Sequence, residues 1–123
     1  VEALREQNQL RFRETRLLEY GWTPEGKLWA AWKIPGMVGG VVFGVPGAVR
    51  RYLVGQTFSA NAKDTARSCG QISINEQGSS YGYTSFLRYA GADIGDVLLT
   101  EFDLAQHTVE LAIADVDILE QYQ

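Results

Sequence analysis

Hydrophobic and polar positions alternate over several short segments of this chain, a period typical of β-strands with one buried face. Residues 16–22 and 27–34 carry aromatic side chains on either side of the sequence TPEG. Pro24 fixes the φ of the first central residue of a turn there, and Gly26 permits the positive φ that follows. Together these features predict a β-hairpin.

A second hairpin is predicted nearer the C-terminus. Residues 97–104 and 108–114 are rich in leucine and β-branched residues, and only the three residues AQH separate them. Two shorter strands are predicted at residues 56–60 and 70–76. The sequence GSSYGY that follows is predicted to form a loop, because glycine and serine are typical of turns.

Two short helices are predicted between these strands. The first spans residues 46–54, since proline suits the first turn of a helix and Gly55 is able to end it. The second has Thr84 or Ser85 as its N-cap and Gly91 as its stop. Each helix is followed by a predicted strand.

These elements predict an α+β fold dominated by β-structure, an open pseudobarrel of about six or seven strands with two to four short helices. Residues 36–45 alternate glycine with β-branched residues, which favours a coiled, barrel-like sheet over a flat one. Asp115 is a candidate N-cap for a terminal helix. We divide the chain into residues 1–13, an N-terminal helix that either stands alone or ends a preceding region, and residues 14–123, a single barrel-like domain.

The composition is that of an ordinary globular protein of 123 residues, with 46% hydrophobic and 21% charged residues. One cysteine, Cys69, excludes an intrachain disulfide and fits a reducing compartment. The longest weakly polar stretch, residues 34–49, contains five glycines and two prolines, too broken for a membrane span. No signal peptide is visible. We therefore expect a domain of a larger cytoplasmic bacterial protein with no membrane association.

The charges are distributed unevenly along the chain. Residues 1–67 contain ten Lys and Arg against six Asp and Glu, whereas residues 68–123 contain one Arg against nine acidic residues. This division predicts either a basic face for a polyanion or two halves that neutralise each other across the fold.

Motifs for catalysis, metals and phosphates are weak or missing. Cys69 and His107 are the single thiol and the single imidazole, and neither lies in a known nucleophile motif. Asp93 and Asp96 are two carboxylates where a metal loop needs more ligands. The glycine-containing segments match neither the Walker nor the dinucleotide pattern. We expect no catalytic residue, no metal and no cofactor. The remaining acidic candidates, interpreted as solvated strand positions, are Glu101, Asp103 and Glu110.

The basic residues are the strongest candidates for a binding surface, because Lys and Arg gathered on one face contact nucleic-acid phosphates. The alternative is a solvated surface of weak ion pairs. The candidate contacts are Arg50, Arg51, Lys63, Arg67 and Asn61, followed by Arg11, Arg13, Arg16 and Lys33. Trp29 and Trp32 differ by three positions on one strand and so face opposite ways. We interpret one as core and the other as a candidate exposed platform for a base or a partner.

Residues 85–104, SFLRYAGADIGDVLLTEFDL, resemble an element of B3-like DNA-binding domains, in which a short helix leads to a GD turn and an apolar strand. Residues 45–53, VPGAVRRYL, resemble the helix entry of swapped-hairpin transcription regulators. The resemblance covers about a third of the chain. It implies a seven-stranded open pseudobarrel with two short helices that grips DNA with two arms, and in which Gly95 and Asp96 are scaffold.

The sequence thus favours a non-catalytic nucleic-acid-binding domain, with DNA favoured over RNA as the partner. The alternative is a protein–protein interaction or oligomerisation module that uses the glycine-rich residues 37–45 and an exposed tryptophan. A third hypothesis, an enzyme that uses the acidic strands or the pair Cys69 and His107, has less support.

Overall fold

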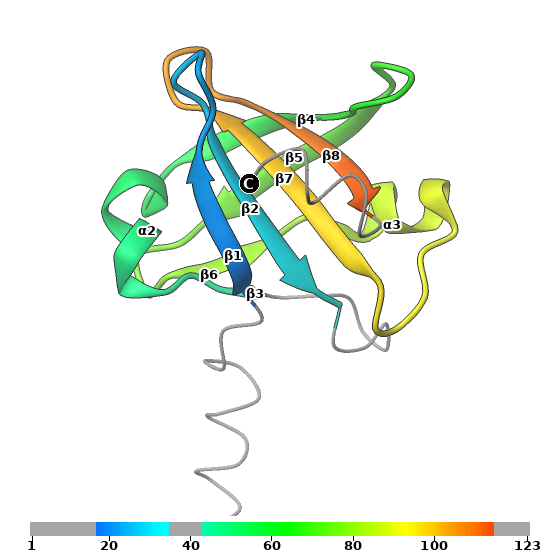
Figure 1. The fold of residues 1–123 in the computed structure, drawn as a ribbon, viewed down its shortest axis with the longest axis horizontal. Helices are drawn as coiled ribbons and strands as arrows, with labels where there is room; N and C mark the ends of the chain where they lie inside the picture. The colour runs from blue at the N-terminus through cyan, green and yellow to red at the C-terminus, as the bar shows by residue number, and fades with distance from the viewer. Residues whose placement is uncertain (1–16, 35–42, 115–123) are drawn as a thin grey trace, which may run out of the picture.

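The computed structural model describes residues 17–34 and 43–114, and these form a curled sheet with two short helices (Figure 1). The described strands are β1 (Leu17–Trp22), β2 (Leu28–Lys33), β3 (Phe43–Gly44), β4 (Thr57–Ala62), β5 (Ser68–Ile74), β6 (Ser79–Tyr81), β7 (Val97–Asp103) and β8 (Thr108–Ala114). The helices are α2 (Gly47–Leu53) and α3 (Thr84–Ala90).

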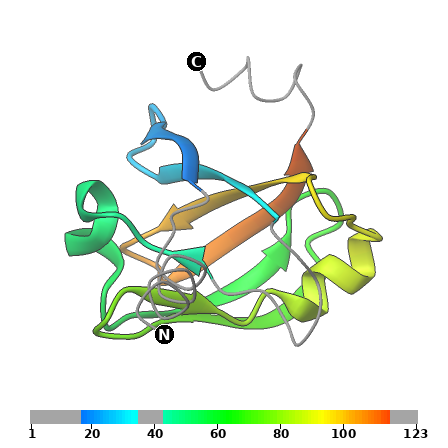
Figure 2. The ribbon, with the colours of Figure 1, turned by 90° about the horizontal axis from the view of Figure 1, so that it is seen from below.

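All eight described strands belong to one sheet in the order β1-β2-β7-β8-β4-β5-β6-β3. The β4–β8 pair is parallel and the other pairs are antiparallel. The sheet curls round so that its faces form the wall of an open barrel (Figure 2). The predicted class, a β-dominated α+β fold with an open barrel-like sheet and short helices, is confirmed.

Both predicted hairpins are present. Residues 23–26 form the turn between β1 and β2, where the Gly26 amide donates to the Thr23 carbonyl at 2.9 Å and Gly26 has a φ of 84°. The hydroxyl of Thr23 also accepts a hydrogen bond from the Lys27 amide at 3.1 Å. Strands β7 and β8 form the second hairpin, with His107 in its turn at a φ of 55°.

The structure corrects two local predictions. The sequence GSSYGY is not all loop, because Ser79–Tyr81 forms β6, paired with β5 on one side and β3 on the other. Strands on both sides impose this conformation on residues of low β-propensity. The N-cap of α3 is Tyr83, without a side-chain hydrogen bond, and not Thr84 or Ser85. The buried Tyr83 ring places the start of the helix one residue earlier than the hydroxyl side chains indicate.

The main core lies inside the curl and is rich in aromatic rings. Trp32 of β2 and Phe43 of β3 pack with ring centroids 5.2 Å apart, and Phe43 meets Tyr83 at 5.0 Å. Strand β2 is second and β3 is last in the sheet order, so these rings join the two ends of the sheet. Further along the barrel, Phe58 of β4 packs edge-to-face on Phe102 of β7 at 4.9 Å.

Helices α2 and α3 lie at opposite sides of the barrel in both views (Figures 1 and 2). In α2, Val49 and Leu53 are buried and Arg50 and Arg51 are exposed, as the sequence predicts. In α3, Phe86 and Leu87 are buried. The predicted left-handed stops are confirmed, because Gly55 and Gly91 have φ values of 76° and 65°.

Several predictions lie outside the described residues. They are the N-terminal helix and domain boundary in residues 1–13, the strand prediction over residues 36–42, and the helix after Asp115. Among residues 17–34 and 43–114, neither helix has the length and hydrophobicity to cross a membrane.

Candidate functional site

The described basic candidates fall into two groups at opposite ends of β4. Arg50 and Arg51 lie on α2, just before β4, and Lys63 and Arg67 lie in the turn after it. Six strand residues span about 20 Å. Lys33 is exposed at the end of β2, and Asn61 is half-buried on β4. Arg11, Arg13 and Arg16 lie outside the described residues.

Lys63 is held by acidic residues of the second half of the chain. Its Nζ lies 2.6 Å from Oε2 of Glu101 and 3.9 Å from Oε2 of Glu110. These two glutamates are direct cross-strand partners on β7 and β8. At this point the two halves of the sequence neutralise each other, which was the alternative to a basic face. The amine of Lys63 therefore has a structural role between two carboxylates.

Arg67 belongs to a contact between the β4–β5 turn and α3. Its guanidinium carbon lies 4.8 Å from the centroid of the Tyr89 ring. The hydroxyl groups of Thr65 and Tyr89 are 2.8 Å apart and share a hydrogen bond. Tyr89 thus fixes this turn against α3, on the side of the barrel away from α2 (Figure 1).

Arg50 and Arg51 remain adjacent and exposed on the last turn of α2. Nη2 of Arg50 donates a hydrogen bond to the Glu76 carbonyl oxygen at 3.0 Å. Nη2 of Arg51 donates to the hydroxyl of Tyr52, and its guanidinium carbon lies 4.7 Å from the centroid of that ring. Both side chains are held by neighbouring groups while most of their N–H donors face solvent.

The expectation of an exposed tryptophan at position 29 or 32 is wrong. The two rings do face opposite ways, but Trp29 is 4% exposed and Trp32 is 0% exposed. Trp32 lies in the main core, whereas Trp29 packs in a second cluster on the other face of the sheet. Gly21 opposite Trp29 provides the space, since a Cβ there would lie 2.8 Å from the indole nitrogen.

Strand β1 instead carries two of the exposed aromatic rings of the described residues. Trp22 is 48% exposed and Tyr20 is 45% exposed. Trp22 meets Tyr52 of α2 edge-to-face, with ring centroids 5.1 Å apart. We call the set Trp22, Tyr20, Tyr52, Arg50 and Arg51 the α2–β1 surface. Alternation along residues 18–22 places Tyr20 and Trp22 on one side of the strand, but their exposure follows from the terminal place of β1 in the sheet.

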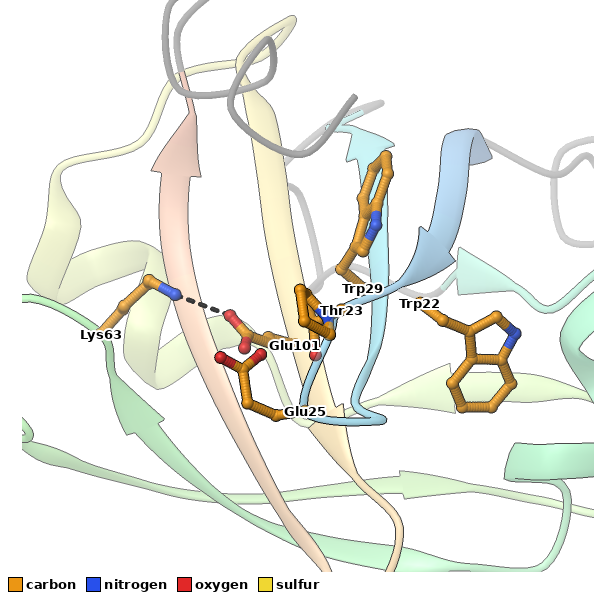
Figure 3. Close-up of a pocket in the computed structure, with 7 residues that line it drawn as sticks. Trp22, Thr23, Glu25, Trp29, Lys63 and Glu101 are labelled. Carbon is orange, nitrogen blue, oxygen red and sulfur yellow. Dashed lines mark hydrogen bonds and ion pairs between the residues drawn. The ribbon is translucent and has the colours of Figure 1, made fainter.

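A hollow of about 290 Å³ lies between the first hairpin and the Lys63–Glu101 ion pair (Figure 3). Its lining residues are Trp22, Thr23, Pro24, Glu25, Trp29, Lys63 and Glu101. The carboxylate of Glu25 lies on the same side as Glu101, whereas the Trp22 ring points away from the ion pair toward α2 (Figure 3). Within the described part of the chain, no three His, Cys, Asp or Glu side chains form a metal-binding group.

The other candidate catalytic residues have structural contacts. The sulfur of buried Cys69 is 3.4 Å from the Arg67 carbonyl oxygen, and the His107 ring stacks on Phe58 with centroids 5.8 Å apart. Asp96 accepts a hydrogen bond from the Asp93 amide, and Asp103 accepts two from the turn that follows it. Each of these side chains therefore has a contact within the fold.

The GD turn that carries part of the B3-like resemblance lies between α3 and β7 and is hydrogen-bonded to the residue that follows β2. The Gly95 amide donates to the Ile34 carbonyl at 2.9 Å, and the Ile34 amide donates to the Asp96 carbonyl at 2.9 Å. These backbone bonds give the turn a scaffold role. Comparison with protein-family models, curated proteins and solved structures found no match. The resemblance to B3-like and swapped-hairpin domains stays a prediction.

Proposed function

We propose that this chain is a non-catalytic nucleic-acid-binding domain of a larger protein, with DNA as the favoured partner and the α2–β1 surface as its contact. The observation that supports this is the pair of exposed arginines on α2 beside the half-buried ring of Tyr52 and the exposed ring of Trp22. Arginine binds phosphate through a planar fork of N–H groups, and aromatic rings offer faces for bases.

The anchoring of the arginines also supports the proposal. Arg50 is tied to the Glu76 carbonyl and Arg51 rests on the Tyr52 ring, so both guanidinium groups are already positioned in the absence of a ligand. Side chains ordered in advance lose less conformational entropy when they bind. Each guanidinium has five N–H donors and uses only part of them in these contacts.

Two of the described basic candidates do not belong to the proposed surface. Lys63 is neutralised by Glu101 and Glu110, and Arg67 is on the α3 side, so neither adds to the field near Arg50 and Arg51. With a net charge of −4, the chain has no general attraction for polyanions. Of the basic candidates that the structure describes, these two arginines are therefore the ones on which binding depends, and the overall charge does not contribute.

Charge reversal of both arginines tests this function. The variant R50E/R51E is compared with the unchanged protein by fluorescence anisotropy with labelled DNA, single-stranded and duplex, over a range of salt concentrations. We expect the unchanged protein to lose affinity as salt rises, with a log–log slope of about −0.7 to −0.9 per phosphate contact. The variant should lose binding to both forms of DNA, because two contacts become repulsive.

The matched control is R88E on α3, which changes an exposed arginine in the last turn of the other helix. It should bind as the unchanged protein does. Full binding by R50E/R51E with an intact fold, or equal losses in both variants, would overturn the assignment to the α2–β1 surface.

A protein–protein or self-association function is the second candidate. The observation in its favour is that β1 is the terminal strand of the described sheet and carries Leu18, which is 55% exposed, next to the exposed Tyr20. Terminal strands with exposed apolar side chains add a strand from a partner. Such binding depends little on salt, and this separates it from the first proposal in the same titration.

A further inference from the structure

The two exposed aromatic rings of the α2–β1 surface lie on β1. Tyr20 and Trp22 are two positions apart on β1 and pair with Ala30 and Leu28 of β2. Directly opposite residues share a face, and Ala30 and Leu28 belong to the main core. Tyr20 and Trp22 therefore project to the same side of the sheet, yet remain 45% and 48% exposed.

The spacing of these rings fits an extended strand. Side chains two positions apart on a β-strand are separated by about 6.8 Å. Along one strand of a DNA duplex the rise per nucleotide is about 3.4 Å, and each base is covered by its neighbours. Rings at twice that spacing are able to stack on successive bases only when the bases are separated from one another. A single strand meets this condition and a duplex does not.

The two arginines of α2 lie beside these aromatic rings. The Trp22 ring meets the Tyr52 ring at 5.1 Å, and the Arg51 guanidinium lies 4.7 Å from the Tyr52 centroid. Arg50 follows next to it on α2 and is anchored on the Glu76 carbonyl. Cations beside a row of exposed rings are the usual composition of sites that bind single strands through stacking and phosphate contacts.

The geometry of α2 is poorly suited to reading a duplex groove. A recognition helix enters the major groove with residues near its N-terminus. The arginines of α2 are in its last turn, and seven residues make a helix of only about 10 Å. The Arg50 side chain is also bonded back to the β5–β6 turn. The α2 arginines are placed to contact phosphates beside the aromatic rings.

We propose that the α2–β1 surface binds a single-stranded nucleic-acid segment, with bases stacked on Trp22 and Tyr20 and backbone phosphates on Arg51 and Arg50. This inference rests on the proposed function and specifies the form of the ligand. The bases stack without sequence readout, because every base has an aromatic face.

The test measures binding of a fluorescein-labelled oligothymidine of about 15 nucleotides, the upper range of site sizes for a small single-strand-binding domain. The same titration is run with a duplex of equal length at low salt. We expect the single strand to bind more tightly than the duplex. The variant W22A should weaken single-strand binding about tenfold and Y20A by a similar or smaller factor, within the range for loss of one stacked base. W22F retains a ring and should keep most of the affinity.

The control variant is Y81A, because Tyr81 on β6 has the same 45% exposure as Tyr20. It should bind as the unchanged protein does. A second measurement keeps the test valid if W22A unfolds. Trp29 and Trp32 are buried, so quenching of the remaining exposed tryptophan by added oligothymidine reports contact at Trp22 in the unchanged protein.

The outcomes separate the two proposals. Preference for the single strand with a specific loss in W22A supports both. Duplex binding that R51A weakens and W22A leaves unchanged overturns the single-strand inference and keeps the proposed function. Absence of binding to either form at low salt overturns the proposed function itself, and the single-strand inference with it.

Discussion

The fold leaves no space for a side chain at position 82, which is a glycine. It has a φ of +111°, and an added Cβ would overlap the carbonyl oxygen of Gln71 on β5. Gly70 also has a positive φ, +86°, but a Cβ there would meet nothing within 4 Å. The two glycines therefore separate the cost of an unusual backbone conformation from the cost of a steric clash.

Alanine substitution at these two glycines should have unequal effects. G70A should lower the free energy of unfolding by about 1–2 kcal/mol, the cost of a left-handed conformation for a residue with a Cβ. G82A should cost more than this, because β5 and the segment leading into α3 must also move apart. Urea unfolding of both variants measures the difference, and equal losses would contradict the steric explanation.

At the scale of elements, one lysine connects three strands. Glu101 of β7 and Glu110 of β8 are cross-strand partners, and like charges opposite each other destabilise a sheet. Lys63, in the turn after β4, places its amine on both carboxylates. Its backbone amide also donates to the Leu111 carbonyl of β8 at 2.8 Å. The parallel β4–β8 pair thus ends at an ion pair that covers the acidic pair of β7 and β8.

Replacing this amine should weaken the sheet. K63M should lower the free energy of unfolding by about 1 kcal/mol at pH 7, since Lys63 is part-exposed and the pair is screened by solvent. Adding E110Q to K63M should restore part of the loss, because only one carboxylate then remains. K33M, at the exposed end of β2, is the control and should stay within about 0.5 kcal/mol. Equal effects of K63M and K33M would show that the ion pair contributes nothing to stability.

At the scale of the whole molecule, aromatic packing closes the curled sheet. Trp32, Phe43 and Tyr83 bring together β2, β3 and the start of α3. The hydroxyl of Tyr83 is buried with Ser80 as its hydrogen-bond partner. Burial raises the pKa of this hydroxyl above its ordinary value of 10.0, and the bond to Ser80 offsets part of the rise. Global stability should therefore depend on pH in the alkaline range.

The sign follows from proton binding. Above pH 10 the unfolded chain releases the Tyr83 proton while the folded chain keeps it, so the free energy of unfolding falls as pH rises, by up to about 1.4 kcal/mol per pH unit for this one group. Below pH 10 the group contributes no slope. Y83F should reduce the alkaline slope and cost about 1 kcal/mol at pH 7 through the lost Ser80 bond. Urea unfolding from pH 7 to 11 measures this, with Y81F as the exposed control. An unchanged slope in Y83F would contradict it.

Local sequence patterns were sufficient to predict most elements. The TPEG turn, the two hairpins, the helices around residues 47–53 and 84–90 and their glycine stops follow from dihedral preferences and short-range alternation, which act over a few residues. Strand β6 was missed because its three residues are held by β5 and β3 and not by their own preference.

Less of the candidate site than of the fold could be predicted from the sequence. Its composition indicated basic residues as candidates, and the adjacent Arg50 and Arg51 could be placed on the exposed side of a helix from periodicity alone. Sequence did not predict that Lys63 would be neutralised by Glu101, 38 positions away, or that Trp29 would be buried while Trp22 is exposed.

Whether a residue lies in a turn, a strand or a helix depends on its own preferences and on its near neighbours, so most of these choices could be predicted from the sequence. Which charges form pairs and which aromatic rings are buried could not be predicted in this way. Those outcomes depend on strand order, on the register of β1 against β2 and on the curl of the sheet, which bring together residues far apart in the chain. For that reason the described basic candidates are divided between the two ends of β4, and the α2–β1 surface is the part of the predicted basic surface in which two of them lie side by side.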